Sequence, residues 1–200
     1  GSFDAIINAL MQQLTLKALQ GGLSNLSGLN GYEGDFLTPD QRQAQSQGNA
    51  LLAALQQISN NAGQYGAVAQ GSIGDIQNTQ LRLQDLANCY EAKGQGAQAS
   101  AAIAARDAYE QRIAFYNERI TRANAAIALL QGFQTRVLQV TSSAQVAAIQ
   151  TDLDAAQASG ALILITEVTI ATQDRATLQS DLNSRNQQTQ SEIQQCRASS

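Results

Sequence analysis

The sequence predicts an all-α fold: an elongated antiparallel helical bundle, or coiled-coil hairpin, with a smaller N-terminal helical lobe. Three observations predict it. Apolar residues recur every three or four positions along most of the chain, and proline occurs once, at Pro39. Aromatic residues make up only 4% of the chain, and tryptophan is absent. A core of Ala, Leu and Ile suits closely spaced helices.

The first segment has the pattern of an amphipathic helix that ends at Gly21 and Gly22. Its apolar positions at helical spacing are Phe3, Ile6, Ile7, Leu10, Met11, Leu14 and Ala18. The glycine- and serine-rich stretch that follows predicts an ordered loop through Phe36, because glycine and serine disfavour a stable helix.

A second helix begins at Thr38-Pro39-Asp40-Gln41, which has the pattern of a capping box with proline at the first helical position. Its apolar positions are Ala44, Leu51, Leu52, Leu55 and Ile58. We expect it to fray at residues 60–63, and we expect little helix before residue 75, because Gly66, Gly71 and Gly74 weaken that stretch.

A long helix is then predicted from about residue 75 to about residue 140. Gly94 and Gly96 lie within it, and each costs about 1 kcal/mol relative to alanine. A bundled helix tolerates that cost, so we expect the helix to continue through both. Its second half carries a heptad seam typical of coiled-coil packing: Tyr109, Ile113, Tyr116, Ile120, Ala123, Ile127, Leu130, Gln134, Val137 and Val140.

The return arm of the hairpin begins after the turn at Thr141-Ser142-Ser143, where Ser142 and Gln145 form a second capping box. Its apolar positions are Val146, Ile149, Leu153 and Ala156, and after Gly160 Leu164, Val168, Ala171, Leu178, Leu182, Thr189, Ile193 and Cys196. Residues 162–170 alternate well enough to form a strand, but their flanks favour a helix surrounded by other helices. The expected division is residues 1–65 and residues 66–200.

The two cysteines predict a disulfide between Cys89 and Cys196. Folding the hairpin about Ser142 places Cys196 opposite about position 88, next to Cys89. Bridged cysteines need Cα atoms about 4.4–6.8 Å apart. The alternative is two free thiols in a cytosolic protein. A persistent disulfide indicates an oxidising compartment, so we expect an exported, mature protein of the periplasm, cell surface or extracellular space.

Composition argues against several chemical activities. With no histidine, the chain lacks Ser-His-Asp and Cys-His arrangements and histidine-based zinc sites. The glycines follow no phosphate-loop or dinucleotide fingerprint. The net charge is −4 and the basic residues are scattered, so we expect no nucleic-acid binding. We therefore expect no enzyme activity, no cofactor, no metal and no catalytic residues. No apolar run approaches the ~18 residues of a membrane span.

Two sets of apolar residues are candidates for interaction with a partner. The first is the stripe of the N-terminal helix, represented by Phe3, Ile7, Leu10 and Leu14. The second is Leu23, Leu26 and Leu29 in the glycine-rich segment 21–36. These leucines either fold onto the chain's own bundle or dock on a neighbouring subunit, since exposed leucine patches usually mark contacts.

The order of segments in the second half resembles the minor-pilin, stalk-tip family of bacterial type IV secretion and conjugation systems. The similar features are Asp107-Ala-Tyr-Glu-Gln-Arg-Ile113, a long helix, the Thr-Ser-Ser turn, Ala144-Gln-Val-Ala-Ala-Ile-Gln-Thr-Asp-Leu153 and a glutamine-rich final helix. They cover about residues 105–195. The resemblance implies an exported, non-enzymatic assembly component; the cysteine pair and residues 21–36 have no counterpart in the family pattern.

We therefore expect an exported structural subunit of an extracytoplasmic assembly, such as a pilus, secretion stalk or surface filament. It would bind through its helical faces and residues 1–36, either to itself as a homo-oligomer or filament or to other subunits. One alternative is a membrane-active protein, such as a pore-forming toxin component, that inserts residues 3–29 or 160–170 into lipid. This is less favoured, because the N-terminal helix lacks a basic face. Another alternative is a soluble adhesin or chaperone with a rod-like body.

Overall fold

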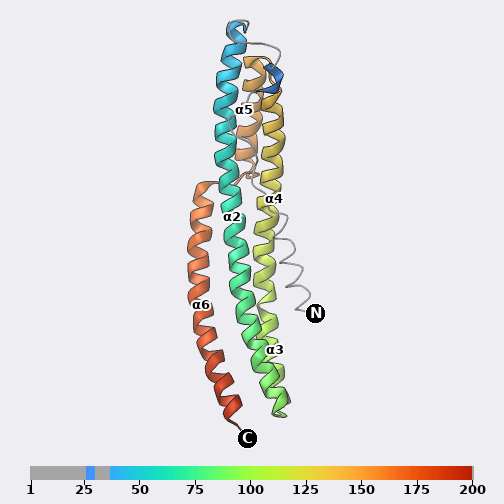
Figure 1. The fold of residues 1–200 in the computed structure, drawn as a ribbon, viewed down its shortest axis with the longest axis vertical. Coiled ribbons are helices and arrows are strands. Elements are labelled where there is room, and N and C mark those ends of the chain that lie inside the picture. The colour runs from blue at the N-terminus through green and yellow to red at the C-terminus, as the bar shows by residue number, and fades with distance from the viewer. Residues whose placement is uncertain (1–25, 30–36, 200) are drawn as a thin grey trace. The chain divides into compact units, whose positions relative to one another are not determined.

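The computed structural model describes residues 26–29 and 37–199. Within those residues all regular structure is helical, which confirms the predicted all-α helical bundle (Figure 1). The elements are the short 3₁₀ helix η1 (Ser27–Leu29), α2 (Pro39–Ala92), α3 (Gly96–Ala108), α4 (Glu110–Leu138), α5 (Ser143–Ala158) and α6 (Ile165–Ala198). The predicted N-terminal helix, with Phe3, Ile7, Leu10 and Leu14, lies outside the described residues, as does Leu23.

The chain forms two compact units. In the described residues, the first consists of 66–121 and 169–199, and the second of 26–29, 37–65 and 122–168. Helices α2, α4 and α6 each contribute to both. The units differ from the division expected from the sequence, because residues 122–168 pack with residues 37–65 rather than with the rest of the chain.

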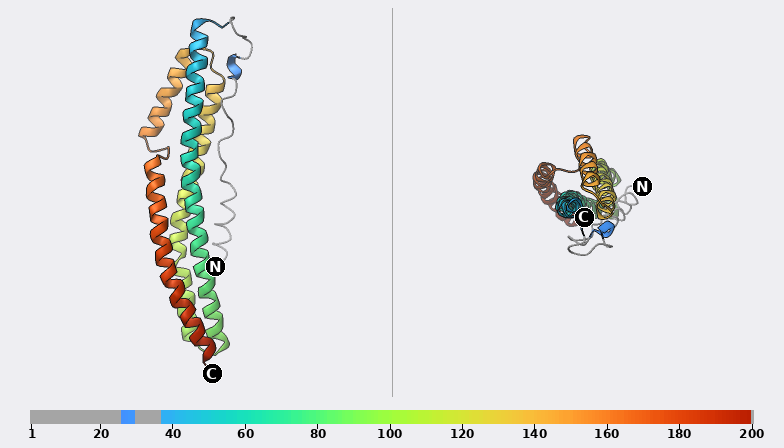
Figure 2. Two further views of the ribbon diagram at one scale, coloured as in Figure 1. Left: turned by 60° about the vertical axis from the view of Figure 1, so that its left-hand side comes forward. Right: turned by 90° about the horizontal axis from the view of Figure 1, so that it is seen from above.

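The second unit is built from the start of α2, the end of α4 and the whole of α5, with η1 against them. Seen from above, these three helices lie next to one another (Figure 2), and their buried side chains form one core. The core cluster is Leu26, Leu29, Ala44, Leu51, Leu52, Leu55, Leu130, Phe133, Val137, Val140, Val146, Ile149, Leu153 and Leu162. The apolar positions predicted on α2, α4 and α5 supply most of it, so helical periodicity accounts for this core.

The first predicted capping box is complete, and the second is formed in part: Ser142 caps α5, but the Gln145 side chain accepts from the N–H of Thr141 at 2.7 Å. The backbone N–H of Thr38 donates to Oε1 of Gln41 at 2.9 Å, and the N–H of Gln41 donates to Oγ1 of Thr38 at 3.1 Å. At the start of α5, the N–H of Gln145 donates to Oγ of Ser142 at 3.3 Å. These side chains satisfy N–H groups that have no partner inside the helix.

The predicted interruption of the second helix at residues 60–74 is wrong, because α2 runs unbroken from Pro39 to Ala92. The stretch contains Gly63, Gly66, Gly71 and Gly74, which disfavour a helix. It also buries apolar residues at helical spacing: Ala62, Tyr65, Ala69, Ile73 and Ile76, each at most 7% exposed. Burial of that stripe outweighs the glycine cost of about 1 kcal/mol per residue.

The continuous helix predicted from about 75 to 140 is also wrong. It is divided at Gly94, which adopts a left-handed conformation with φ of 70°. The N–H of Gln95 donates to the Tyr90 carbonyl at 2.8 Å, and the N–H of Gly94 donates to the Glu91 carbonyl at 3.0 Å. This pair of bonds is a Schellman motif, which terminates α2. None of residues 91–98 is buried, so no packing opposes the chain reversal there.

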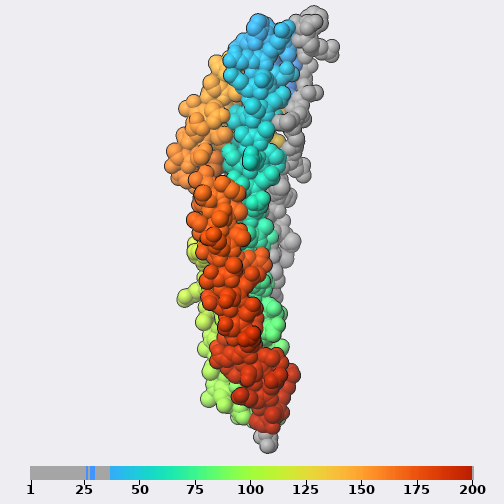
Figure 3. Space-filling model, turned by 90° about the vertical axis from the view of Figure 1, so that its left-hand side faces the viewer, coloured from blue at the N-terminus to red at the C-terminus, as the bar shows by residue number. Residues whose placement is uncertain are grey.

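In the first unit, α2 and α6 run in the same direction. Nε of Arg175 lies 3.0 Å from Oδ2 of Asp75, and the hydroxyl of Thr79 donates to Oδ1 of Asn186 at 2.9 Å. The residue numbers rise together along both helices, which defines a parallel pair. Figure 3 shows α6, in orange to red, along one face of the molecule.

The disulfide between Cys89 and Cys196 closes this parallel pair near the ends of α2 and α6. Their Cα atoms lie 6.3 Å apart. Beyond it, Nζ of Lys93 donates to the carbonyl of Ser199 at 2.6 Å. The predicted pair of cysteines is correct, but the predicted geometry is not. Cys89 belongs to α2, which is parallel to α6, and not to the arm of the hairpin that runs antiparallel to it.

The last difference concerns residues 159–164, which were expected to be helical. They form the connection between α5 and α6, and Gly160 at their start has a φ of 81°. The N–H groups of Gly160 and Ala161 donate to the carbonyls of Gln157 and Ala156. A second Schellman motif therefore ends α5. No strand occurs here or elsewhere in residues 37–199.

Candidate functional site

A pocket in the second unit is the candidate functional site. It lies between α2 and the connection from α5 to α6 and has a volume of about 520 Å³. Its lining residues are Ala54, Gln57, Ile58 and Asn61 of α2, Gln157 of α5, and Leu162, Ile163, Leu164, Ile165 and Thr166. A volume of this size is typical of a ligand or side-chain binding site.

Two large apolar side chains at this pocket are exposed. Leu164 is 43% exposed and Ile165 is 57% exposed. The sequence predicted that Leu164 would face a core, and this is wrong. Leu162 and Ile163, immediately before them, are the buried residues of the connection. The run therefore consists of two consecutive side chains that anchor the connection, Leu162 and Ile163, followed by two that face outward, Leu164 and Ile165.

A second, smaller pocket continues this surface along α2 and α5. It has a volume of about 380 Å³ and is lined by Gln47, Ala50, Leu51, Ala54, Val146, Ala147 and Gln150. Ala54 lines both pockets. We call the two together the α2–α5 groove. On α2 it extends from Gln47 to Asn61, which corresponds to about 21 Å at 1.5 Å per residue.

The lining of the α2–α5 groove carries no charged side chain. Its polar members are the amides of Gln47, Gln57, Asn61, Gln150 and Gln157 and the hydroxyl of Thr166, and the others are apolar. Such a surface suits apolar side chains flanked by uncharged polar groups. It offers neither a nucleophile with a base nor a set of metal ligands. No group of three or more His, Cys, Asp or Glu residues that could hold a metal occurs in the described parts of the chain.

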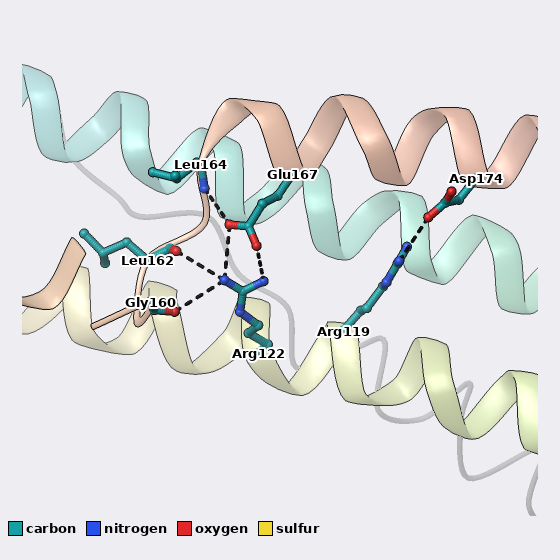
Figure 4. A network of polar contacts seen from close by, with 7 residues as sticks. All are labelled: Arg119, Arg122, Gly160, Leu162, Leu164, Glu167 and Asp174. Carbon is teal, nitrogen blue, oxygen red and sulfur yellow. Dashed lines mark hydrogen bonds and ion pairs between the residues drawn. The ribbon is translucent and has the colours of Figure 1, made fainter. Parts of the chain in front are cut away.

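The shape of the connection beside the groove depends on Arg122 of α4 (Figure 4). Its guanidinium contacts both carboxylate oxygens of Glu167, at 2.6 and 3.2 Å, and donates to the carbonyls of Gly160 and Leu162 at 3.3 and 3.4 Å. The same carboxylate accepts the N–H of Leu164 at 3.0 Å. One arginine therefore joins the end of α5, the connection and the first turn of α6.

Glu167 has a second role at the start of α6. It is the third residue of the helix, and its contact with the N–H of Leu164 satisfies a donor that has no partner inside the helix. A carboxylate in the first turn also interacts favourably with the positive end of the helix dipole. The position of Leu164 and Ile165 at the groove therefore depends on this carboxylate.

The charges of this pair reinforce each other. The hydrogen bond from Arg122 lowers the pKa of Glu167, and burial opposes that effect only in part. The hydrogen bond to Glu167 correspondingly raises the pKa of Arg122. The Arg122 guanidinium also lies 5.6 Å from the ring of Tyr65, on the α2 side of the unit. Both members of the pair therefore remain charged at neutral pH.

The residues selected from the sequence lie in three different places. Cys89 and Cys196 are bonded to each other in the first unit. Leu26 and Leu29, at 3% and 4% exposure, pack into the core of the second unit. Of the two alternatives for these two leucines, folding onto the chain's own bundle is the one observed. Neither lines the α2–α5 groove.

The groove was not predicted, although a signal for it exists in the sequence. Gly160 is followed by five apolar residues. The first turn of a helix that faces a single core cannot bury all five. An apolar run that follows a terminating glycine indicates side chains on two sides of a connection.

No protein family, curated protein or solved structure matches this chain. A search of the described helices for a stretch long and apolar enough to span a membrane finds none.

Proposed function

We propose that this chain is an exported, non-enzymatic subunit of an extracytoplasmic assembly, such as a pilus, secretion stalk or surface filament. In this proposal it binds other subunits through the α2–α5 groove and through residues 1–25, which precede the leucines buried in its own core. The observation that carries the proposal is the uncharged apolar groove with Leu164 and Ile165 exposed at its edge. Exposed apolar surfaces of this kind usually mark protein contacts.

The disulfide supports the proposed location outside the cytoplasm. Cys89 and Cys196 are the only cysteines, and their bond joins two helices more than a hundred residues apart in the sequence. Disulfides that stabilise a fold are typical of secreted and periplasmic proteins and rare in the cytosol. One such cross-link therefore favours a compartment outside the cytoplasm.

The resemblance to the minor-pilin, stalk-tip family of type IV secretion systems gives the proposal its more specific form. That resemblance lies in the order of the long helix, the Thr141-Ser142-Ser143 turn and the glutamine-rich last helix. In such an assembly the subunit supplies surfaces for its neighbours. The chemistry of the groove, which lacks charged side chains and a nucleophile paired with a base, agrees with a role of that kind.

Fractionation of the cells that naturally produce the chain tests the proposal. We expect the chain outside the cytoplasm, with Cys89 and Cys196 inaccessible to alkylation without reductant, and within a complex much larger than 21.2 kDa on native gels. Chain in the cytosol with two free thiols would refute export. A monomer in native extracts would refute the role as a subunit.

A groove variant shows whether complex formation uses this surface. Ile165→Asp places a charge at the edge of the groove, and we expect it to reduce the amount of chain in the complex. Ile170→Asp is the matched control, because Ile170 is 55% exposed on the same helix and does not line the groove. Equal effects of the two substitutions would exclude the groove as the binding surface.

A further inference from the structure

We infer that the disulfide between Cys89 and Cys196 is a redox-sensitive switch. When the bond is reduced, the end of α6, residues 183–199, separates from α2 and α3, while the helices formed by residues 39–80 and 110–158 stay folded. The inference goes beyond the proposed function and does not depend on it. It follows from the way packing is distributed along α6, whose end is held mainly by the sulfur bridge.

The end of α6 buries little apolar surface. Of residues 183–199, only Thr189, Ile193 and Cys196 are buried. Ile193 is the one large apolar side chain in this segment, since Thr189 carries a hydroxyl and the sulfur of Cys196 belongs to the bridge. Most stability of a helix in a protein comes from packing of an apolar face. A segment with so narrow an apolar stripe gains little of it.

Polar contacts do not compensate for this small apolar surface. In the described residues, two hydrogen bonds join residues 183–199 to the rest of the unit. The hydroxyl of Thr79 donates to Asn186 at 2.9 Å, and Nζ of Lys93 donates to the Ser199 carbonyl at 2.6 Å. The second bond is exposed to solvent. None of the ion pairs between described residues includes residues 183–199.

The preceding part of α6 is held in place without a covalent bond. Leu178 and Leu182 are 1% and 2% exposed, so both contribute large apolar side chains to the packing of the first unit. Two ion pairs join this part to α2 and α4: Arg175 with Asp75 at 3.0 Å, and Arg119 with Asp174 at 3.2 Å. We therefore place the boundary of the segment that separates just after Leu182.

The apolar cluster beside the bridge is small. Its buried members are Leu86 and Ala87 of α2, Ala102 of α3 and Ile193 of α6. Figures 1 and 2 show the end of α6 next to the end of α2. Ile193 lies about one helical turn before Cys196, so the bridge holds this side chain in the cluster. Separation of α6 would expose the other three residues to solvent.

The reductant that opens the switch is a dithiol. Cys89 is partly exposed and Cys196 is 3% exposed, so a thiolate of the reductant attacks Sγ of Cys89. The S–S bond breaks, Cys196 leaves as a thiolate and takes up a proton, and a mixed disulfide forms at Cys89. The second thiol of the reductant then displaces Cys89, which also becomes a thiol. The chain gains two electrons and two protons, and the dithiol is oxidised to a disulfide.

Hydrogen exchange of the full-length purified chain, measured by mass spectrometry with and without dithiothreitol, tests the inference. We expect reduction to speed exchange in residues 183–199 on the order of tenfold or more, because a local opening then suffices for exchange. Residues 40–80 and 113–155 should keep their rates. Unchanged exchange in residues 183–199, or equal acceleration in all three segments, would overturn the inference.

The chain with both Cys89→Ser and Cys196→Ser is the control for the reductant. Its residues 183–199 should exchange as fast as those of the reduced natural chain, whether or not dithiothreitol is present. Exchange as slow as in the oxidised natural chain would overturn the inference, because the segment would then be held without the bridge.

A pair of matched substitutions tests whether weak packing is the cause. Thr189 is fully buried, and its hydroxyl donates to the Arg185 carbonyl of its own helix at 2.9 Å. Thr177 makes the same kind of bond to Gln173 at 3.3 Å, but it is exposed. In the reduced chain, Thr189→Val should slow exchange in residues 183–199 about fourfold, because it buries roughly one more apolar carbon. Thr177→Val should not. Equal rates in the two reduced variants would overturn the inference.

Discussion

Cys89 and Cys196 are bonded at the same offset, 107 residues, that separates the hydrogen-bonded side chains of Thr79 and Asn186. Two helices that keep one offset over several turns are parallel and in register. The disulfide therefore holds α6 against α2 at a register that the hydrogen bond between Thr79 and Asn186 also selects. Thr79 itself is fully buried, so a shift of register would leave its hydroxyl without this partner.

The first prediction concerns this disulfide. Replacing both cysteines by serine should lower the free energy of unfolding by at most about 4–5 kcal/mol, because the bond closes a loop of 107 residues in the unfolded chain. Chemical denaturation with and without reductant measures the change. The double variant should show no dependence on reductant. If reduction of the natural chain leaves its midpoint unchanged, the bond does not stabilise the fold.

The second prediction concerns Gly28 in η1. A Cβ at this position would lie 2.5 Å from the carbonyl oxygen of Val140, and also meets the carbonyl of Gln139, so the backbone must move. Gly28→Ala should displace Leu26 and Leu29 from the core and speed hydrogen exchange there, with a loss of roughly 1–3 kcal/mol. Gly132→Ala is the control: nothing lies within 4 Å of its added Cβ, and α4 should gain about 1 kcal/mol.

The third prediction concerns pH. The pKa of Glu167 is lowered in the folded chain, chiefly by the hydrogen bond from Arg122. Its contribution to stability is therefore fully present above the unfolded value of about 4.3 and is lost as the pH falls through the lower folded value. The protection of the Leu164 N–H, which bonds to Glu167, against hydrogen exchange should fall in that range, measured relative to the intrinsic exchange rate at the same pH.

Two variants make the pH prediction specific. Glu167→Gln should remove this loss of protection between neutral and acidic pH, because the amide does not titrate. Asp152→Asn should leave it unchanged, since Asp152 pairs with Arg136 at a site where both side chains are about half exposed. Exposed pairs of this kind contribute little. An unaltered pH profile in Glu167→Gln would contradict the assignment.

The fourth prediction concerns the start of α5. Ser142→Ala removes the acceptor for the N–H of Gln145 and should destabilise the second unit by about 1 kcal/mol in thermal or chemical unfolding. Ser142→Asn keeps an acceptor at the same position and should restore most of that loss. A loss of the same size in both variants would mean that the capping bond has no measurable effect.

Helical periodicity could be read from the sequence with good accuracy. Along α4 and just after it, the predicted heptad seam is buried at Ile113, Tyr116, Ile120, Ala123, Ile127, Leu130, Val137 and Val140. The other two predicted seam residues, Tyr109 and Gln134, are only partly buried. On α6 the predicted Val168, Ala171, Leu178, Leu182, Thr189, Ile193 and Cys196 are also buried. These stripes could be predicted because one face of each helix meets a core, which selects apolar residues at a fixed spacing.

The positions of the chain reversals could not be read from glycine content. Gly63 and Gly74 lie inside α2, while Gly94 ends it. Whether a glycine ends a helix depends on the apolar surface that neighbouring turns bury. That surface is large around Ile73 and absent around Gly94. The prediction failed because it weighed each glycine by local preference alone.

The groove could not be located from the sequence for a related physical reason, although the apolar run after Gly160 is visible there. Predicting it requires knowing that α5 ends at Gly160 and that α6 starts again at Ile165. Only then do Leu162 and Ile163 face the core while Leu164 and Ile165 face outward. The Arg122 network that holds this connection joins residues 38 to 45 positions apart, and no local pattern reveals it.

The parallel arrangement of α2 and α6 has an electrostatic consequence at the end where Lys93 meets Ser199. Each helix carries a partial negative charge at its carboxyl end, equivalent to roughly half an electron, and parallel helices bring two such ends together. These ends repel each other, and the ammonium of Lys93, 2.6 Å from the Ser199 carbonyl, lies where it neutralises part of that field. The sulfur bridge lies one helical turn before Lys93 and Ser199. It keeps the carboxyl ends of the two helices adjacent even in salt solutions that screen the charge of the lysine.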